Sequence, residues 1–345
     1  MEEITTTAGL WQLRSNWNEI EAAGEPVNPF LSWDWQWSWW ENFGTDLELH
    51  CFLVWDGDYP LGIVPLYSAP GPSRIMRFGG GVALSDHLGF LFRPGRAEEV
   101  AAAVLDRLFF ADGRSVATPG TVSLDLHFVP DASPALAALR AAAEPLELRQ
   151  SLTQEEVSPR VVLDSDFQSY LSGRLNKKDR HELRRKLRRL DNERPGWRLV
   201  DQDLLGLERA LDAFFPILKA SGPHKVEFLT TPVEAFIRSA SGRIHKRGWL
   251  RIQFIESDGR FLAASLGFTV SGRWHLYNSG YEPELAALSP GLICVAEGIR
   301  AAIAEGCHTA DFLRGSEGYK YHLGAENSPL WRLELSPTGG PETRT

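Results

Sequence analysis

The sequence predicts an α+β protein of two domains, each with a mixed, mainly antiparallel sheet flanked by helices. The chain has 345 residues, and a single hydrophobic core usually stops growing at about 250–300 residues. Each half of the chain follows the same order of expected elements: helices, then a strand meander, then a helix and a final strand. This shared order indicates an internal structural repeat, although the halves share no residue-level identity.

The N-terminal domain, residues 1–160, opens with helical signals and continues with strands. Ser32 is expected to cap a helix over Trp33–Phe43, which Gly44 ends. Asp56-Gly57-Asp58 lies between two apolar strand-like runs and predicts a hairpin turn. The expected helices are 8–23, 33–43, 97–110 and 133–143, and the expected strands are 47–55, 59–68, 86–92 and 122–128.

The C-terminal domain, residues 161–335, repeats that order. Asn176 is expected to cap a helix, and Leu183, Leu187 and Leu190 recur on it at i, i+4 and i+7 as a buried seam. Tight turns at 258–259 and 271–272 predict an antiparallel meander. The expected helices are 164–171, 176–194, 204–221, 232–247 and 290–305, and the expected strands are 249–256, 260–270, 273–279, 309–313 and 330–335.

The composition excludes several classes of protein. Hydrophobic residues make up 43% and charged residues 23% of the chain, which is typical of soluble globular proteins. The start of the chain has no signal-peptide pattern, and no apolar run reaches the roughly 18 residues of a membrane span. Three scattered cysteines suit a reducing compartment. We therefore expect a cytoplasmic protein, and we expect its Pro/Gly/Thr-rich tail, residues 336–345, to be disordered.

One segment opposes the acidic charge of the chain. Residues 174–189 hold nine Lys and Arg against two acids, a net charge of +7. Because the whole chain has a net charge of −9, the rest of the chain has a net charge of −16. Lys177, Arg180, Arg184 and Arg185 are candidates for binding an acceptor or a phosphate. The ligand stays open between CoA phosphates, a nucleotide-linked acceptor and RNA, and the alternative is a solvated amphipathic helix.

The segment 277–292 predicts an anion site. The strand ending at Tyr277-Asn278-Ser279 leads through a loop to Ser289-Pro290-Gly291-Leu292. Proline suits the first helical position, and Gly291 leaves backbone N–H groups open to close approach. Such N–H groups and the helix dipole favour a pyrophosphate or phosphopantetheine arm. The structural alternative is an ordinary capped helix.

Two further patterns suggest acid–base or oxyanion chemistry. Asp311 and Arg314 end a short strand, and Lys320 follows in an aromatic-flanked loop. A lysine in such a cleft stabilises an oxyanion or binds a phosphate, or it packs its stem on the Tyr rings. In the N-terminal half, Asp86 is a candidate base beside His87, and an ordinary turn is the alternative.

The sequence shows no metal-ligand set. The nine His residues form no i, i+4 pair and do not recur with acids at ligand spacing. There is also no GxSxG motif and no P-loop, which argues against a serine hydrolase or an NTPase.

Taken together, these motifs resemble the GNAT superfamily. The basic helix Lys177–Arg189, the strand end Tyr277–Gly280, Ser289-Pro290-Gly291 and the segment 311–320 carry the resemblance. It is nearest to the BioF2-like, CelD-type branch (cellulose-biosynthesis CelD-like), which Asn28–Ser32, Trp39-Trp40, Phe43-Gly44 and Ser85-Asp86 also match.

The resemblance implies tandem GNAT domains, similar to the Fem-type peptidyltransferases. It places an acyl donor, acetyl-CoA or another acyl-CoA, between the strands 273–279 and 309–313, with its phosphates at 289–292. Lys320 stands where Fem-type relatives have a lysine that assists acyl transfer. Asp311 or Asp86 is the expected base, and Tyr277 or Tyr281 the expected proton donor.

The chain departs from GNAT proteins in one respect. The phosphate loop Arg/Gln-x-x-Gly-x-Gly/Ala is absent, and only Ser289-Pro290-Gly291 stands in its place. An acyl carrier or an aminoacyl-tRNA therefore stays open as the donor. We expect an acyltransferase acting on a small-molecule or glycan-precursor acceptor, with two alternatives: a Fem-type aminoacyl-tRNA-dependent transferase, and a non-catalytic GNAT scaffold that binds nucleic acid or a protein partner.

Overall fold

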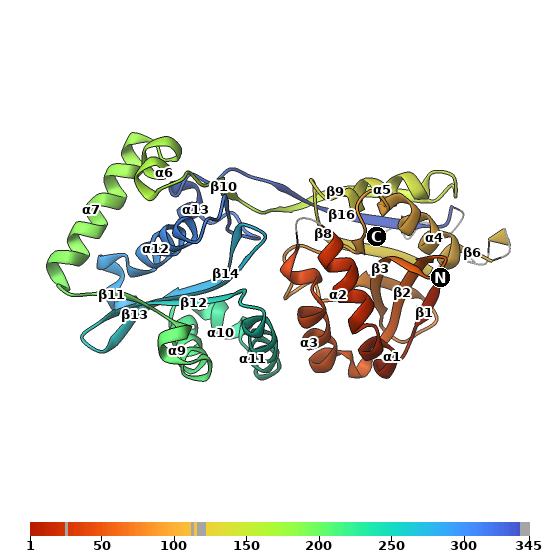
Figure 1. The fold of residues 1–345 in the computed structure, drawn as a ribbon, viewed down its shortest axis with the longest axis horizontal. Coiled ribbons are helices and arrows are strands. Elements are labelled where there is room, and N and C mark those ends of the chain that lie inside the picture. The colour runs from red at the N-terminus through yellow and green to blue at the C-terminus, as the bar shows by residue number, and fades with distance from the viewer. Residues whose placement is uncertain (25–26, 112–113, 116–121, 339–345) are drawn as a thin grey trace. The chain divides into compact units, whose positions relative to one another are not determined.

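The computed structural model describes residues 1–24, 27–111, 114–115 and 122–338. The chain divides into two compact units (Figure 1). The N-terminal unit consists of residues 1–156 and the segment that begins at Ser328, and the C-terminal unit is Val157–Asn327.

The N-terminal unit is built on one mixed sheet with the order β1-β2-β3-β4-β8-β16-β9, and β5 pairs with β3. The strands are β1 (Glu2–Ile4), β2 (Glu48–Asp56), β3 (Tyr59–Ser68), β4 (Arg74–Phe78), β5 (Leu91–Phe92), β8 (Val122–Pro130), β9 (Arg149–Val157) and β16 (Pro329–Ser336), with a small hairpin of β6 (Phe110–Ala111) and β7 (Arg114–Ser115). Strands β2, β3 and β4 form an antiparallel meander, and β4 pairs with β8 in parallel.

Helices complete this unit. They are α1 (Thr7–Gln12), α2 (Arg14–Ala23), α3 (Trp33–Phe43), α4 (Ala97–Phe109) and α5 (Pro134–Ala143), with short 3-10 turns η1 (Pro29–Leu31) and η2 (Gly44–Asp46). Helix α3 begins at the expected cap, where Ser32 accepts a hydrogen bond from the amide of Trp35. Apolar faces of α4 and α5 pack on the sheet in one core with Phe52, Leu126 and Leu333.

The C-terminal unit has a six-stranded sheet with the order β10-β15-β14-β13-β12-β11. The strands are β10 (Arg160–Val162), β11 (Arg198–Asp201), β12 (Leu250–Ser257), β13 (Arg260–Val270), β14 (Arg273–Tyr281) and β15 (Thr309–Asp311). Every pairing is antiparallel except that of β14 with β15. The sheet therefore repeats the plan of the first unit: a meander, a helical connection, and a strand parallel to the last strand of the meander.

Helices cover both faces of this sheet (Figure 1). They are α6 (Phe167–Arg174), α7 (Lys177–Glu193), α8 (Gln202–Leu205), α9 (Leu207–Ala220), α10 (Pro223–Phe228), α11 (Thr231–Lys246), α12 (Pro290–Ala304) and α13 (Gly318–His322), with the 3-10 helix η3 (Pro283–Leu288). Helix α12 packs on β13 and β14 from one side, and α9 packs on the same strands from the other. Among the described residues, no helix combines the length and the apolar character that a membrane crossing requires.

The expected fold class is confirmed, with local corrections. The strand expected at 86–92 is reduced to Leu91–Phe92, and the helix expected at 8–23 is two helices that meet at Leu13. Helices α10 and α13 lie where no helix was expected, because each is shorter than two turns and shows no helical periodicity.

The final strand lies in the sheet of the N-terminal unit. The sequence predicts a C-terminal domain that extends to residue 335, whereas β16 pairs with β8 from Leu330 opposite Pro130 to Leu335 opposite Leu124. Leu330, Leu333 and Leu335 are fully buried in the core of that unit. The order of elements along the chain does not reveal that the last strand pairs with the sheet of the first unit. Of the tail that was expected to be disordered, residues 339–345 lie outside the described part of the chain.

Candidate functional site

The candidate site lies in the C-terminal unit, where two parallel strands diverge. Strands β14 and β15 pair from Arg273 opposite Thr309 to His275 opposite Asp311. Strand β15 ends at Asp311, while β14 continues to Tyr281. Beyond His275, no described strand pairs with that edge of β14. The two strands therefore diverge after His275 and Asp311, and we call this divergence the fork. Its open side carries the unpaired backbone amide and carbonyl groups of β14.

A β-bulge bends β14 at the fork. Leu266 of β13 lies opposite Asn278 and Gly267 opposite Leu276, so Tyr277 is the additional residue. Glycine is required at 267, because a Cβ there would lie 2.1 Å from the carbonyl oxygen of His275. The bulge changes the direction of the following residues, Asn278 and Ser279, which are half-buried. Bulges of this kind occur often beside active sites, where they redirect side chains.

The chain that leaves β15 is held in a tight loop. The carboxylate of Asp311, 5% exposed, accepts hydrogen bonds from Ser158 Oγ (2.8 Å) and from the amide of Leu313 (2.9 Å). Leu313 has φ +55° and Gly315 has φ +108°. Asp311 thus fixes a turn with positive φ angles, a conformation that a non-glycine residue adopts only when its surroundings impose it.

Lys320 lies inside this loop. Its ammonium donates hydrogen bonds to the carbonyl oxygens of Leu313 (3.2 Å), Arg314 (2.8 Å) and Gly315 (3.0 Å), and Glu317 Oε2 lies 2.9 Å away. The residue is only 2% exposed. Three carbonyl oxygens and one carboxylate surround the ammonium, so Lys320 holds the loop in this state. Direct contact with a substrate oxyanion requires the exchange of one of these bonds.

A second set of polar groups joins the two arms of the fork. The hydroxyl of Tyr319, from α13, is hydrogen-bonded to the side chain of Ser279, from β14. Burial raises the pKa of Tyr319 above its ordinary value, and the charge of Glu317 adds to that effect, so the phenol stays protonated at neutral pH. Lys225 of α10 donates to Asn278 Oδ1 at 2.6 Å.

Glu317 adds a carboxylate to this site. Partial burial would raise the pKa of its carboxyl group, but the hydrogen bond and charge of Lys320, together with the charge of Lys225, hold that pKa below its ordinary value. The side chain is 59% exposed. It is therefore an ionised group that solvent and a substrate can reach.

The N-terminus of α12 lies at the end of β14 and η3. Ser289 has φ +55° and its side chain makes no cap hydrogen bond, so it does not satisfy the first-turn amides at Gly291 and Leu292. Instead, Ser289 Oγ lies 3.0 Å from Lys186 Nζ of α7. A cation thus adjoins the positive end of a helix dipole, an arrangement that favours a negatively charged group between them.

Tyr281 packs against the first turn of α12. A Cβ on Gly291 would lie 3.0 Å from its ring. Gly291 therefore lets the aromatic ring approach the helix, as well as leaving its amide accessible. Tyr281 is half-buried and joins the end of β14 to the same helix N-terminus as Lys186.

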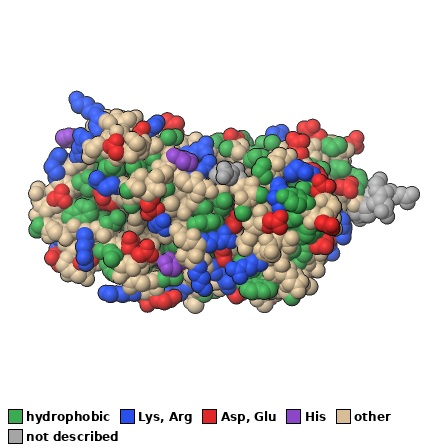
Figure 2. Space-filling model, viewed as in Figure 1, with side chains coloured by type: hydrophobic (Ala, Val, Ile, Leu, Met, Phe, Trp, Pro, Cys, Tyr) green, Lys and Arg blue, Asp and Glu red, His purple; other side chains and the backbone are tan. Residues whose placement is uncertain are grey.

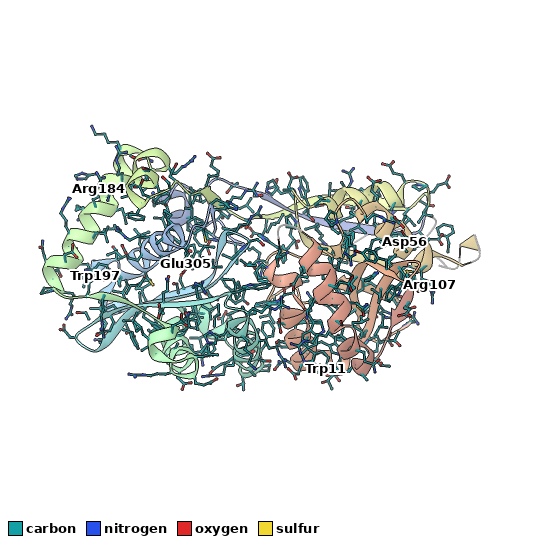
Figure 3. The ribbon with its side chains drawn as sticks, in the orientation of Figure 1. Trp11, Asp56, Arg107, Arg184, Trp197 and Glu305 are labelled. Carbon is teal, nitrogen blue, oxygen red and sulfur yellow. The ribbon has the colours of Figure 1, made fainter. Side chains whose placement is uncertain are left out.

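Helix α7 carries the basic surface. Leu183 and Leu190 are buried as expected, and Asn176 accepts a hydrogen bond from the amide of Asp179 as the expected cap. Lys177, His181, Arg184 and Arg188 recur at i, i+4, i+7 and i+11, and all four are exposed. Lys and Arg side chains project from the region of α7 in Figure 2, and Figure 3 labels Arg184 there. Lys177, Arg184 and Arg188, with His181 between them, lie on one exposed face of α7, which we call the cationic stripe.

Three other cations of α7 are engaged locally, and within the stripe Arg184 donates to Gln168 Oε1 at 3.1 Å. Arg185 forms an ion pair with Glu182 (2.7 Å), and Arg189 forms one with Glu193 (2.7 Å). Arg180 donates to the carbonyl oxygen of Ser172 at 3.2 Å. Within the described residues, Lys177 and Arg188 form no ion pair.

The structure brings most of the predicted site residues together in one unit. Tyr277, Asn278, Ser279 and Tyr281 lie along β14, and Ser289, Gly291 and Leu292 lie at the start of α12. Asp311, Arg314 and Lys320 lie on the other arm of the fork. Asp86 is in the N-terminal unit, where it is 8% exposed beside Ser85, whose hydroxyl accepts from Trp35 Nε1 at 2.8 Å.

Sequence reasoning overlooked four residues of the site: Lys186, Lys225, Glu317 and Tyr319. Lys186 could have been found, because it lies three residues after Leu183 and four before Leu190 and so borders the buried face of α7. Lys225 could not, because α10 is a short helix far from β14 in sequence.

Comparisons with known proteins agree with this geometry. Residues 177–321 match the family model described as an acetyltransferase (GNAT) domain. No curated protein matches the sequence. Among solved structures, FemX is 12% identical with a TM-score of 0.65, and the match covers 96% of this chain and 97% of FemX.

Two further structures are similar. The C-terminal domain (DUF2156) of a putative lysylphosphatidylglycerol synthetase from Agrobacterium fabrum is 10% identical with a TM-score of 0.59, over 95% of this chain and 92% of that one. A conserved protein of unknown function from Bacteroides thetaiotaomicron is 13% identical with a TM-score of 0.56, over 94% and 97%. At these identities the likeness shows a shared fold, which extends over both units.

Proposed function

We propose that this chain, a GNAT superfamily protein with the fold of FemX, is an acyltransferase that moves an acyl group from an acyl-CoA to an amine or hydroxyl acceptor. The observation that carries the proposal is the position of Lys186 at the N-terminus of α12, beside the fork of β14 and β15. A phosphate-bearing donor needs both a cationic anchor and an edge for its amide-containing arm. The C-terminal unit offers both within one helix–strand connection.

The donor is proposed to bind in two parts. Its pyrophosphate lies at the amides of Gly291 and Leu292, with Lys186 and Ser289 as further contacts. Its pantetheine arm, which contains two amides, follows the open edge of β14 along Tyr277, Asn278 and Ser279. The thioester then lies at the fork. This arrangement uses local groups in place of the missing glycine-rich loop.

The transfer step needs a nucleophile, a base and a proton donor. The acceptor amine or hydroxyl attacks the thioester carbon and loses a proton, for which Asp311 is the proposed base. Lys320 is proposed to stabilise the oxyanion, or to fix the loop that does so. Tyr319 joins Tyr277 and Tyr281 as a proposed proton donor to the leaving thiolate, because its phenol stays protonated.

The acceptor is proposed to be a small molecule or a glycan precursor, with a role in polysaccharide or cell-envelope synthesis. An ionised Glu317 at the fork favours an acceptor that carries an amine, because the carboxylate attracts an ammonium group.

Calorimetric titration with CoA, acetyl-CoA and a longer acyl-CoA tests the donor. We expect binding that weakens about tenfold, or about 1.4 kcal/mol, in Lys186→Gln. The matched control is Lys178→Gln, which removes an exposed cation of the same helix. The proposal fails if no CoA species binds at millimolar concentration, or if both variants bind like the original protein.

A second candidate function rests on the cationic stripe. Lys177, Arg184 and Arg188 span three helical turns on one face, and cations in a row suit a nucleic-acid backbone. This observation favours a Fem-type transferase that takes its acyl group from an aminoacyl-tRNA.

Two charge reversals on α7 separate this candidate from the first. The double variant Arg184→Glu, Arg188→Glu reverses two charges of the cationic stripe. The double variant Arg185→Glu, Arg189→Glu changes the net charge by the same amount, but at residues that form ion pairs within α7. If tRNA is the donor carrier, the first double variant loses salt-dependent tRNA binding and the second keeps more of it. Equal losses would show a general charge effect. Donor binding without transfer to any acceptor would instead support a non-catalytic scaffold.

A further inference from the structure

The backbone of Ser279 faces the open edge of β14. In an antiparallel pair, hydrogen-bonded and non-hydrogen-bonded residue pairs alternate. The amide of Glu282 donates to the carbonyl oxygen of Leu262 at 3.0 Å, which makes these two residues a hydrogen-bonded pair. Three positions back along the same register, Ser279 lies opposite Ser265 and is therefore in a non-hydrogen-bonded pair. Its N–H and C=O groups thus point away from β13, towards the open side of the fork.

The amide of Ser279 already has an acceptor. It donates to the side-chain oxygen of the preceding residue, Asn278 Oδ1, at 3.1 Å. Lys225 Nζ donates to the same oxygen at 2.6 Å, in a short, charge-assisted hydrogen bond. The hydroxyl of Ser279 is hydrogen-bonded to Tyr319, which holds the residue in place. A side chain that a lysine fixes therefore covers an amide of the open edge.

The lysine belongs to α10, a helix with little buried surface. It has six residues, none of which is buried, and it packs on α9. The end of α9 is fixed against β14, because a Cβ on Gly280 would lie 2.6 Å from Ser221 Oγ and 2.8 Å from the carbonyl oxygen of Ile217. Elements with few buried contacts open at a low cost in free energy. Helix α10 can therefore move away from β14 while the sheet and α9 keep their positions.

We propose that Asn278 and Lys225 form a latch that closes the open edge of β14 until an acyl donor binds. The inference rests on the proposed function, in which the pantetheine arm of the donor follows this edge. A carbonyl oxygen of that arm competes with Asn278 Oδ1 for the N–H of Ser279. Donor binding therefore displaces the side chain of Asn278 and releases Lys225, and with it α10. Both are positioning residues, because they act on the donor through the amide of Ser279.

The sign of the effect on affinity separates a latch from a direct contact. If Lys225 attracted the phosphates of the donor, or if Asn278 bound the pantetheine arm, removing either side chain would weaken CoA binding. Removing part of a latch strengthens CoA binding, because the donor then competes with a weaker acceptor or with none.

Calorimetry of the full chain with CoA and ADP tests the latch. We expect CoA affinity to rise about threefold to tenfold in Asn278→Ala and by a smaller factor in Lys225→Met. The double variant should bind CoA no more tightly than Asn278→Ala, because the two residues form one latch. ADP has a pyrophosphate but no pantetheine arm, so its affinity should be the same in all these proteins.

Hydrogen exchange gives a second measurement, of the helix itself. In the original protein, saturation with CoA should speed the exchange of the α10 amides, because the contact with β14 is lost. In Asn278→Ala, exchange should be fast with and without CoA. Slower exchange of α10 in the CoA complex of the original protein would overturn the latch.

The matched control is Lys219→Met, which removes a cation of α9 that is paired with Glu234 at 3.1 Å. It should bind CoA like the original protein. The latch is overturned if Asn278→Ala or Lys225→Met binds CoA as the original protein does or more weakly, or if ADP affinity rises as much as CoA affinity. Misfolding cannot imitate the expected result, because a misfolded variant does not bind more tightly. Absence of CoA binding in every protein would instead refute the proposed donor, and the latch with it.

Discussion

Lys186 of α7 lies 3.0 Å from Ser289 at the N-terminus of α12, although 103 positions separate the two residues. The contact joins the basic helix to the one helix N-terminus that the sequence singled out as an anion site. Because α7 also contacts α13 through Asp179 and His322 (2.8 Å), this helix links both arms of the fork. Helix α7 therefore contacts both the proposed phosphate site and the loop that follows β15.

The first prediction concerns Ser289. Ser289→Ala removes the hydroxyl that orients Lys186 but leaves the lysine charge and the backbone amides. We expect a threefold to tenfold loss of CoA affinity, about 0.6–1.4 kcal/mol, because a hydrogen bond to a charged group is lost. Calorimetry of Ser289→Ala, Lys186→Gln and the double variant measures the coupling. Strictly additive losses would show that the two side chains act independently.

The second prediction concerns the bulge in β14. Gly267→Ala places a methyl group against the carbonyl oxygen of His275, so the strand must shift. We expect a loss of about 1–3 kcal/mol in the free energy of unfolding and a loss of transfer activity. Gly242→Ala is the control, because a Cβ there meets nothing within 4 Å. Urea unfolding of both variants provides the comparison, and equal stabilities would contradict the role of the bulge.

The third prediction concerns the pH dependence of stability in the N-terminal unit. His127 lies between Asp125 (3.1 Å) and Glu155 (2.6 Å). The hydrogen bond to Asp125 raises the pKa of His127, burial opposes this, and the bond to Glu155 raises it further. A raised pKa in the folded state means that the stabilisation is complete below the unfolded pKa of about 6.5 and is lost as pH rises through the folded value.

Urea unfolding as a function of pH measures this effect. From pH 6 upward, the free energy of unfolding should decrease more steeply in the original protein than in His127→Gln. A His127→Gln protein with an unchanged pH slope would rule out this histidine as the source.

The fourth prediction concerns Lys320. Lys320→Met keeps the length of the side chain but leaves three carbonyl oxygens and Glu317 without their cation. Leaving buried carbonyl oxygens without their donor costs about 1–3 kcal/mol. We expect lower stability and the loss of transfer, together with retained CoA binding, because Lys320 is outside the proposed phosphate contacts. A fully active Lys320→Met enzyme would exclude any role of Lys320 in transfer.

The fifth prediction concerns Tyr319. Tyr319→Phe removes the hydroxyl bonded to Ser279 and the proposed proton donor. We expect kcat to fall about 10²–10⁴-fold with little change in donor affinity, as for other general acids. An acceptor assay with a thioester of lower leaving-group pKa should recover part of the rate. If kcat is unchanged, Tyr319 is not the proton donor, and Tyr277 and Tyr281 remain the proposed donors.

The sequence by itself determined most of the longer helices and strands and their local signals. Asn176, Ser32 and Pro290 begin helices where capping chemistry predicts, because a cap depends on residues only a few positions apart. The meander of β12, β13 and β14 follows from its two-residue turns. These interactions are local, so the order of residues contains the information that they need.

Only the tertiary structure decided which of these segments come into contact. The contacts of Lys186 with Ser289, of Lys225 with Asn278 and of Tyr319 with Ser279 each join segments that are distant in sequence. The structure also turned Lys320 from a side chain in an open loop into a buried cation bonded to three carbonyl groups. Such contacts depend on how helices pack on the sheet, and packing is set by the shape of the whole core rather than by any short pattern.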